Sequence, residues 1–283
     1  MDTEIREATP SHLRARKKTP FDPWAAGKMV WQISQAFIVF AVIAYLIWRG
    51  AMAMEYNWQW YRVSPYFYRM IDGEFIPGPL LRGLVETLRL AGIAGIIAVS
   101  LGFVTAFARL SKSIAAQVIA KWYLESIRNT PLLVQLFLFY FVLAPIFGVD
   151  RFWAGVLCLA FFEGSFAAEI IRGGIIGVDK GQYEGANAMG FSVFDKYRYI
   201  VVPQSIPLIL PPLTGLLISL IKHSAIVSVI AVAELTTAGL NIIADTFMAF
   251  EIWLIVAAIY LAVTISLSIG VSLLERSFQK YNK

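Results

Sequence analysis

The side chains with the clearest chemical potential in this sequence are ionisable groups inside long apolar stretches. Glu163 interrupts one such stretch, and Lys222, His223 and Ser224 interrupt a later one. An ionised carboxylate at the centre of a bilayer costs roughly 2.5–3.5 kcal/mol on insertion scales, so such groups usually face one another or a polar cavity. Both signs of charge are present, as a zwitterionic solute requires. We therefore expect these four residues to border a substrate path, with an internal ion pair or hydrogen-bond network as the alternative.

A second pair of charges, Glu169 and Arg172, lies near the end of the stretch that contains Glu163. The two residues are three positions apart, a spacing that places them on one face of a helix, where opposite charges interact. We expect this pair to have a structural or gating role rather than to bind substrate.

Catalytic chemistry is not indicated anywhere in the sequence. No Gly-x4-Gly-Lys-Ser/Thr motif is present to hold a nucleotide. Two histidines, His12 and His223, and one cysteine, Cys158, are too few to indicate a Ser/His/Asp set, a metal cluster or a disulfide framework. We predict no catalytic residue, no metal ligand and no cofactor in this chain, so any ATP must be bound by another subunit.

The composition places these residues in a membrane protein. Hydrophobic residues make up 58% of the chain and charged residues 15%, against about 45–50% and about 25% in ordinary globular proteins. The net charge of +5 does not indicate a nucleic-acid-binding protein, because the basic residues lie in short loops and ends between apolar runs, as membrane topology requires. The expected fold class is all-α and polytopic.

Six apolar runs are long enough to be transmembrane helices, since about 20 apolar residues cross a bilayer. The connection 109–130 is polar with short helical character, and 234–251 is too polar to span. The six runs cover residues 30–48, 84–108, 131–149, 152–171, 205–233 and 252–274, and the fifth is interrupted at residues 222–224.

The first apolar run follows a polar tail and is read as an uncleaved span. Its 19 residues exceed the roughly 7–15 of a signal-peptide core. The connection that follows is rich in Trp and Tyr, which favour a membrane interface. We therefore divide the chain into a tail (1–28), an extra first span with its connection (29–79) and a main membrane domain (80–283).

A polar island, residues 178–203, separates the fourth and fifth apolar runs and suits a surface docking loop. Asp179 can accept hydrogen bonds from free N–H groups at a helix start. Residues 182–189 suit a helix of two to three turns. Gly190 stands where a left-handed residue commonly follows a helix.

A second short helix is predicted in the same loop. Ser192 and Asp195 resemble a capping box, with Asp in the place of Glu. Pro203 is expected to break the helix that follows. The loop is therefore expected to run helix, sharp glycine turn, helix and proline break.

The loop also resembles a family signature. The spacing resembles that of the "EAA" motif of ABC importer permeases. The matching positions are Glu184, Gly185, Ala186, Gly190, Ile200, Val202 and Pro203. At two of them, Gly185 and Val202, the residue type differs from the motif. Four flanking segments are similar to the polar amino acid branch of that family: residues 128–133 (RNTPLL), residues 169–175 (EIIRGGI), the Gly181-Gln182 pair and the Pro203-Gln204 pair. The similarity covers roughly residues 80–276.

The resemblance implies an inner-membrane permease subunit with a coupling helix between spans four and five. That helix would dock in a cleft of the ATPase, and the residues expected to carry coupling are Gln182, Glu184, Gly185, Ala186, Gly190 and Pro203. Residues 222–224 resemble the family's Lys-Asp/Asn-Thr/Ser element, with His223 in place of the acid or amide.

The resemblance also implies the partners. Two permease chains, identical or paralogous, would line one path in the membrane lipid, and two ATPase subunits would bind ATP and Mg. A periplasmic or lipid-tethered protein would deliver a polar amino acid. The expected location is a bacterial plasma (inner) membrane.

The basic residues predict the orientation independently of the family. One set of alternate connections and ends contains 17 Lys and Arg, whereas the opposite set contains 5. The positive-inside rule then places both termini and the 178–203 loop in the cytoplasm, and the 49–79 connection in the periplasm.

Two other classes of function stay open at this point. An ion-coupled secondary carrier or channel would use the same intramembrane charges, but no inverted repeat or matching pair of broken helices is evident. A non-transporting scaffold or membrane enzyme is the other alternative. Only the importer requires a stoichiometric cytoplasmic ATPase.

Overall fold

The structure is a computed structural model that describes residues 23–54 and 56–281. The chain divides into two units, Met1–Trp58 and Gln59–Lys283, each described here by itself. Most of the predicted polar tail, residues 1–22, lies outside the described residues.

The first unit contains one long helix, α1 (Pro23–Ala53). Its residues Trp31–Ala53 are long and apolar enough to cross a membrane. Large side chains such as Phe37 and Phe40 are more than two-thirds exposed within the unit. The helix is longer than the predicted run 30–48 and has the length and composition of the expected first span.

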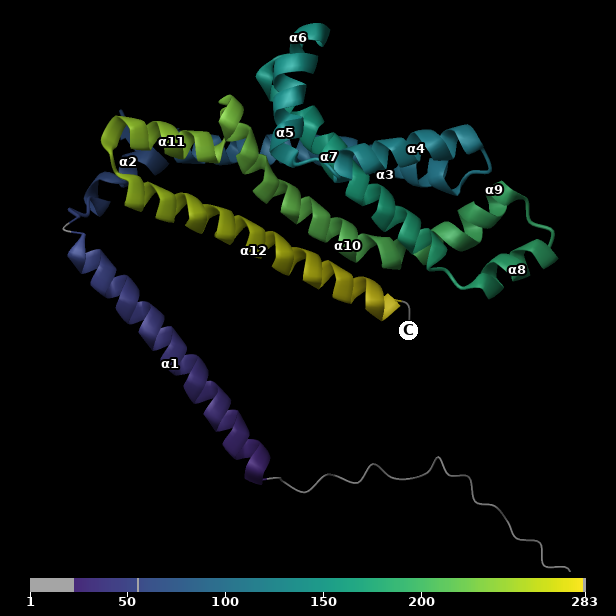
Figure 1. The fold of residues 1–283 in the computed structure, drawn as a ribbon, viewed down its shortest axis with the longest axis horizontal. Coiled ribbons are helices and arrows are strands. Elements are labelled where there is room, and N and C mark those ends of the chain that lie inside the picture. The colour runs from purple at the N-terminus through teal and green to yellow at the C-terminus, as the bar shows by residue number, and fades with distance from the viewer. Residues whose placement is uncertain (1–22, 55, 282–283) are drawn as a thin grey trace, which may run out of the picture. The chain divides into compact units, whose positions relative to one another are not determined.

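The second unit is built almost entirely from helices (Figure 1). Two short turns, Trp60–Arg62 and α2 (Ser64–Phe67), lead into a small hairpin. The remaining elements are α3 (Pro79–Leu110), α4 (Ile114–Arg128), α5 (Leu132–Phe137), a π-helical stretch (Leu138–Leu143), α6 (Ala144–Phe147), α7 (Arg151–Ile176), α8 (Lys180–Ala188), α9 (Val193–Lys196), a π-helical turn (Tyr197–Val201), α10 (Val202–His223), a 3-10 stretch (Ser224–Ile230), α11 (Leu235–Thr246) and α12 (Ala249–Tyr281).

Helices α3 and α7 form the centre of the unit, with α10 packed beside them and α12 lying along α10. Small residues allow the close approach of α3 and α7. A Cβ atom added at Gly102 would lie 2.7 Å from the Cβ atom of Ala167. Fully buried leucines, among them Leu90, Leu159 and Leu220, fill the adjoining core.

Five described helices are long and apolar enough to span a membrane, or six if the bent pair formed by α4 and the segment Leu132–Phe147 is one span. This confirms an all-α polytopic fold. The predicted third run, 131–149, is a span only as part of that pair, which bends by 106°. Pro131 explains the bend, because the residue before a proline is driven out of the helical conformation.

The connection 49–79, predicted only as an aromatic-rich linker, contains the exception to the helical fold. Strands β1 (Tyr68–Ile71) and β2 (Glu74–Pro77) pair antiparallel. Asp72 (φ 53°) and Gly73 (φ 81°) join them, as in the tight hairpin turns that need two positive φ angles.

The predicted helix break at Pro203 is wrong. Helical structure runs through the proline, and Val193–Ile230 counts as one span-length segment. Pro203 lies in the first turn of α10, where the missing N–H is tolerated. In the preceding π turn, Val202 donates to the carbonyl of Tyr197. The extra residue of a π turn changes the local ladder, so the helix continues.

Candidate functional site

The polar loop between α7 and α10 has the helix starts and stops that its sequence predicts. The carboxylate of Asp179 accepts a 2.7 Å hydrogen bond from the N–H of Gly181 at the start of α8. Gly190 has a φ of +75°. The N–H of Gly190 donates to Asn187 at 3.1 Å, and the N–H of Phe191 donates to Ala186 at 3.1 Å. This pair of bonds is the Schellman arrangement, and it confirms a left-handed residue after the helix.

The start of α9 differs in one detail from a full capping box. The N–H of Asp195 donates to the Ser192 hydroxyl at 3.1 Å, as expected. The Asp195 carboxylate, however, accepts from that same hydroxyl at 2.6 Å. A capping-box Glu would reach the backbone N–H of the cap residue. Aspartate is one methylene shorter, so it binds the nearer hydroxyl.

Side-chain bonds tie the loop to itself and to the adjoining spans. Lys196 Nζ donates to the Asn187 amide oxygen at 2.9 Å, which links α9 to α8. The Tyr183 hydroxyl donates to the carbonyl of Ile175 in α7 at 2.7 Å. Partial burial, together with the neighbouring Tyr197, raises the pKa of Tyr183, so this hydroxyl keeps its proton.

The six predicted coupling residues differ in exposure and in their contacts. Glu184 and Gly185 are exposed, whereas Ala186 is buried. Gln182 accepts a 3.0 Å bond from Gln204 in α10. Gly190 shapes the turn, and Pro203 lies in the first turn of α10.

The same loop also exposes large apolar side chains. Met189, Val193 and Phe194 are 66%, 70% and 67% exposed. The loop therefore presents a carboxylate and an apolar patch on a braced scaffold, as a protein-docking surface does.

Within the helical bundle, the structure brings Glu163 and His223 together. The Nδ1 atom of His223 lies 2.5 Å from Oε1 of Glu163. Glu163 is buried in α7, and the His223 side chain at the end of α10 is 44% exposed. The ring of Phe162 meets the imidazole edge-on, with centroids 6.0 Å apart. A buried carboxylate and a half-exposed imidazole can bind the polar groups of a solute inside an apolar helical bundle.

The other two residues of the predicted path lie differently. Lys222 is exposed. Ser224 is fully buried, and its hydroxyl donates to the carbonyl of Ile221 at 2.6 Å. The hydroxyl of Ser224 therefore satisfies the end of α10, while Glu163 and His223 form the paired part of the set.

Glu169 and Arg172 form the ion pair that their spacing predicts. Nη2 of Arg172 lies 2.6 Å from Oε2 of Glu169, and Nε of Arg172 donates to the same oxygen at 3.1 Å. Arg109 and Arg128 lie near enough to add to the stabilisation of the Glu169 charge. Three cations from α3, α4 and α7 thus gather around one carboxylate.

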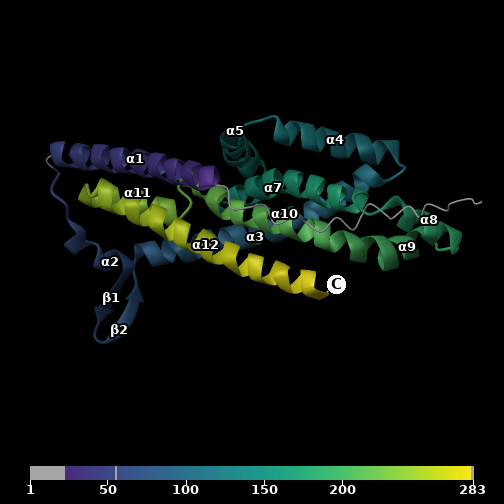
Figure 2. The same cartoon turned by 90° about the horizontal axis from the view of Figure 1, so that it is seen from below.

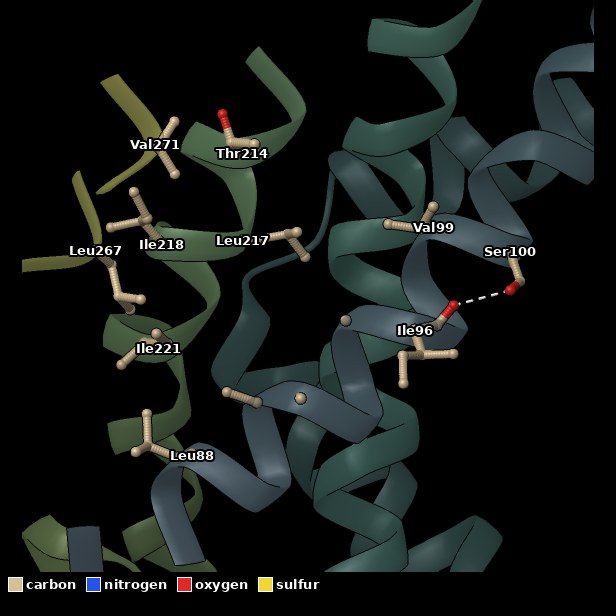
Figure 3. Close-up of a pocket in the computed structure, with 13 residues that line it drawn as sticks. Leu88, Ile96, Val99, Ser100, Thr214, Leu217, Ile218, Ile221, Leu267 and Val271 are labelled. Carbon is tan, nitrogen blue, oxygen red and sulfur yellow. Dashed lines mark hydrogen bonds between the residues drawn. The ribbon is translucent and has the colours of Figure 1, made fainter. Parts of the chain in front are cut away.

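An apolar groove of about 630 Å³ between α3, α10 and α12 is a separate feature. Figure 3 shows Leu88, Leu217 and Ile221 among its lining side chains. The hydroxyls of its two polar residues donate within their own helices, Ser100 to Ile96 and Thr214 to Pro211. The groove offers no free polar group to a zwitterion and does not include Glu163 or His223.

Two buried carboxylates, Glu234 and Glu251, were not singled out from the sequence. Glu251 accepts a 2.6 Å hydrogen bond from the N–H of Gln59. Glu234 caps α11. Its two oxygens accept from the N–H groups of Thr237 and Thr236 at 2.7 and 2.8 Å. The Tyr260 hydroxyl also donates to it at 2.9 Å. The detectable signal was an acidic residue just before a helix-forming segment. Because its partners satisfy it, Glu234 is a structural residue that joins α11 to α12.

Among the residues that the structure describes, no group of three or more His, Cys, Asp or Glu side chains is placed to hold a metal ion. Cys158 is free and buried in α7.

Comparison with known proteins agrees with the fold. The family described as "Binding-protein-dependent transport system inner membrane component" matches residues 98–280, more than half of the chain. The chain belongs to this family. It is therefore a membrane-embedded permease component of a transport system, the class that the loop signature predicts.

Curated relatives match the main membrane domain. The probable glutamine ABC transporter permease protein GlnM of Bacillus subtilis (strain 168) is 38% identical over 200 residues, covering 70% of this chain and 92% of the relative. The nopaline transport system permease protein NocM of Agrobacterium fabrum (strain C58 / ATCC 33970) is 36% identical over 207 residues, covering 69% and 86%.

Solved structures show the same architecture. A chain from the "Crystal structure of an amino acid ABC transporter with histidines" is 41% identical, with a TM-score of 0.66 and coverage of 70% of this chain and 94% of that one. A chain of the inward-facing MetNI methionine ABC transporter shares the fold at 19% identity, with a TM-score of 0.60 and coverage of 70% and 95%.

Proposed function

We propose that this chain is the permease subunit of an ATP-driven importer that carries a polar amino acid into the bacterial cytoplasm. Family membership and relatives named for glutamine and nopaline transport support the substrate class. A periplasmic binding protein delivers the amino acid. Two permease chains line the path, and two cytoplasmic ATPase subunits bind ATP and Mg.

The braced loop with an exposed Glu184 is the observation that carries this proposal. Asp179, Tyr183 and Lys196 fix the loop internally, while Glu184 and several apolar side chains of the loop are exposed. A rigid loop can transmit the movement of an attached subunit to the transmembrane helices, whereas a flexible loop would deform instead. We assign α8 as the helix that docks on the ATPase.

The substrate path is assigned to the Glu163–His223 pair, with Lys222 beside it. An amino acid carries a carboxylate and an ammonium group. Imidazole and lysine nitrogens suit the first, and the Glu163 carboxylate suits the second. The pair Glu169–Arg172 is assigned as a gate or brace at the end of α7 that leads to the loop.

The orientation is assigned from basic residues. Cytoplasmic termini and a cytoplasmic 178–203 loop agree with the count of 17 Lys and Arg against 5. The same orientation puts α8 within reach of a cytoplasmic ATPase.

The test is retention of the ATPase by a Glu184→Ala permease during purification. Charge-assisted hydrogen bonds contribute roughly 1.5–3 kcal/mol, so docking should weaken by about 10- to 100-fold. The loss should grow with salt, because salt screens exposed charges. Glu86→Ala is the matched control, since Glu86 is a carboxylate near the start of α3 that pairs with Arg89. Normal retention and uptake in Glu184→Ala would refute the assignment of α8.

A further inference from the structure

The hairpin before α3 has one wholly apolar face. In the register, Tyr68 lies opposite Pro77, and Met70 lies opposite Phe75. Because side chains alternate along a strand, these four residues share one face. The other face is mixed in polarity and contains Arg69, Ile71, Glu74 and Ile76.

The apolar face is exposed in the described part of the chain. Tyr68, Met70 and Phe75 are 49%, 64% and 59% exposed. The rings of Tyr68 and Phe75 stack with centroids 5.8 Å apart and planes 19° apart. An isolated two-stranded hairpin is at best marginally stable in water. A face of this composition therefore needs a covering surface.

The base of the hairpin is fixed at Gly78, the residue just before α3. The N–H of Gly78 donates to the carbonyl of Phe67 at 2.6 Å. A Cβ atom at Gly78 would collide with the backbone of Tyr66. Tyr66 and Phe67 in turn pack on the core cluster that contains Leu80. The hairpin is thus a built extension of the span rather than a loose loop.

The direction in which the hairpin projects from the bundle indicates what covers its apolar face. Figure 2 shows β1 and β2 projecting sideways from the bundle, away from the line of α3. An exposed apolar surface of α3 begins beyond the hairpin, where Val85 is 61% exposed. A hairpin that leaves the first residue of a span sideways runs along the membrane surface instead of into the water.

We propose that the hairpin Tyr68–Pro77 lies in the membrane interface, with the face of Tyr68, Met70, Phe75 and Pro77 turned toward lipid acyl chains. Tyrosine favours this depth because its ring is apolar and its hydroxyl is polar. Arg69 and Glu74 on the opposite face remain in water among the headgroups. The lipid surface of α3 thereby continues onto the hairpin.

Spin labels on opposite faces test this proposal in the complete importer, reconstituted in lipid vesicles. Met70→Cys reports the apolar face, and Glu74→Cys is the matched control on the polar face. The native Cys158 is fully buried and contributes little background. We expect collisions with dissolved oxygen to be several-fold more frequent at position 70, and collisions with a water-soluble nickel chelate several-fold more frequent at position 74. Phe75→Cys and Arg69→Cys provide an independent second pair.

Equal access of the nickel chelate to both faces would overturn the proposal. So would a label at position 70 that stays accessible in vesicles and becomes protected only when the binding protein is added, because the face would then dock a protein. Each variant is first checked for normal assembly, so that the labels report the native hairpin.

Discussion

Glu163 and His223 lie 60 positions apart in the chain, yet the imidazole Nδ1 is 2.5 Å from the carboxylate Oε1. The contact joins the middle of α7 to the last residue of α10. A carboxylate that is 2% exposed in an apolar bundle needs such a partner. The pair therefore stabilises the packing of two spans and also keeps a polar group inside the membrane domain.

We expect Glu163→Gln to lower amino acid uptake while the complex still assembles. The amide keeps the shape of the side chain but removes its charge. A charge-assisted hydrogen bond contributes roughly 1.5–3 kcal/mol, so we expect uptake to fall by about 10- to 100-fold. Ser165→Ala is the control, because the buried Ser165 hydroxyl donates to the carbonyl of Phe162 within α7 and is not among the path residues. Uptake and ATPase rates are measured in proteoliposomes, and wild-type uptake by Glu163→Gln would make the pair purely structural.

Gly190→Ala should uncouple ATP hydrolysis from uptake. Its φ of +75° costs a residue with a Cβ atom about 1–2 kcal/mol, and relief of that strain would redirect Phe191 and Ser192. The matched control is Gly215→Ala, because Gly215 also has nothing within 4 Å but lies inside α10, outside the loop. That change should stabilise the helix by about 0.5–1 kcal/mol. If both variants hydrolyse ATP and transport alike, the glycine turn does not contribute to coupling.

Gly102→Ala should lower the unfolding temperature of the complex. The new Cβ atom meets Ala167 at 2.7 Å, and overpacking of this kind typically costs about 1–3 kcal/mol. Gly92→Ala lies on the same helix with nothing within 4 Å, so it should be neutral or slightly stabilising. Thermal unfolding in detergent compares the two. Equal melting temperatures would mean that α3 and α7 are less tightly packed than described.

The orientation is checked by cysteine labelling of intact cells. Lys180→Cys and a cysteine in the tail should be shielded from an impermeant reagent added outside, because the distribution of basic residues predicts that both are cytoplasmic. Asn57→Cys should react. Labelling at position 180 would reverse the orientation and remove α8 from the reach of a cytoplasmic ATPase.

The caps of α8 could be predicted from the sequence because they depend on neighbouring residues. Asp179 bonds Gly181, two positions away, and Gly190 bonds Asn187. The hairpin also had a local signal, Asp72-Gly73 between two short apolar strands. The interpretation of residues 49–79 as an interfacial linker overlooked it.

Long-range contacts could not be predicted in the same way. Glu234 is buried because Thr87, 147 positions earlier, is beside it. The pairing of Glu163 with His223 is equally non-local, although both residues stood out as polar groups in apolar runs. The sequence pattern identifies which polar side chains need a hydrogen-bond partner. The tertiary packing decides which residue becomes that partner.

The helical segment Val193–Ile230 contains both the second half of the loop and His223. Within it, α10 has 22 residues, which correspond to about 33 Å of helix. Helical structure is continuous from α9 to the Glu163–His223 contact, but it includes the π turn Tyr197–Val201 and three internal prolines, Pro207, Pro211 and Pro212. Prolines and π turns are the places where helices bend. A displacement at the loop is therefore either transmitted to His223 or taken up by bending at these positions.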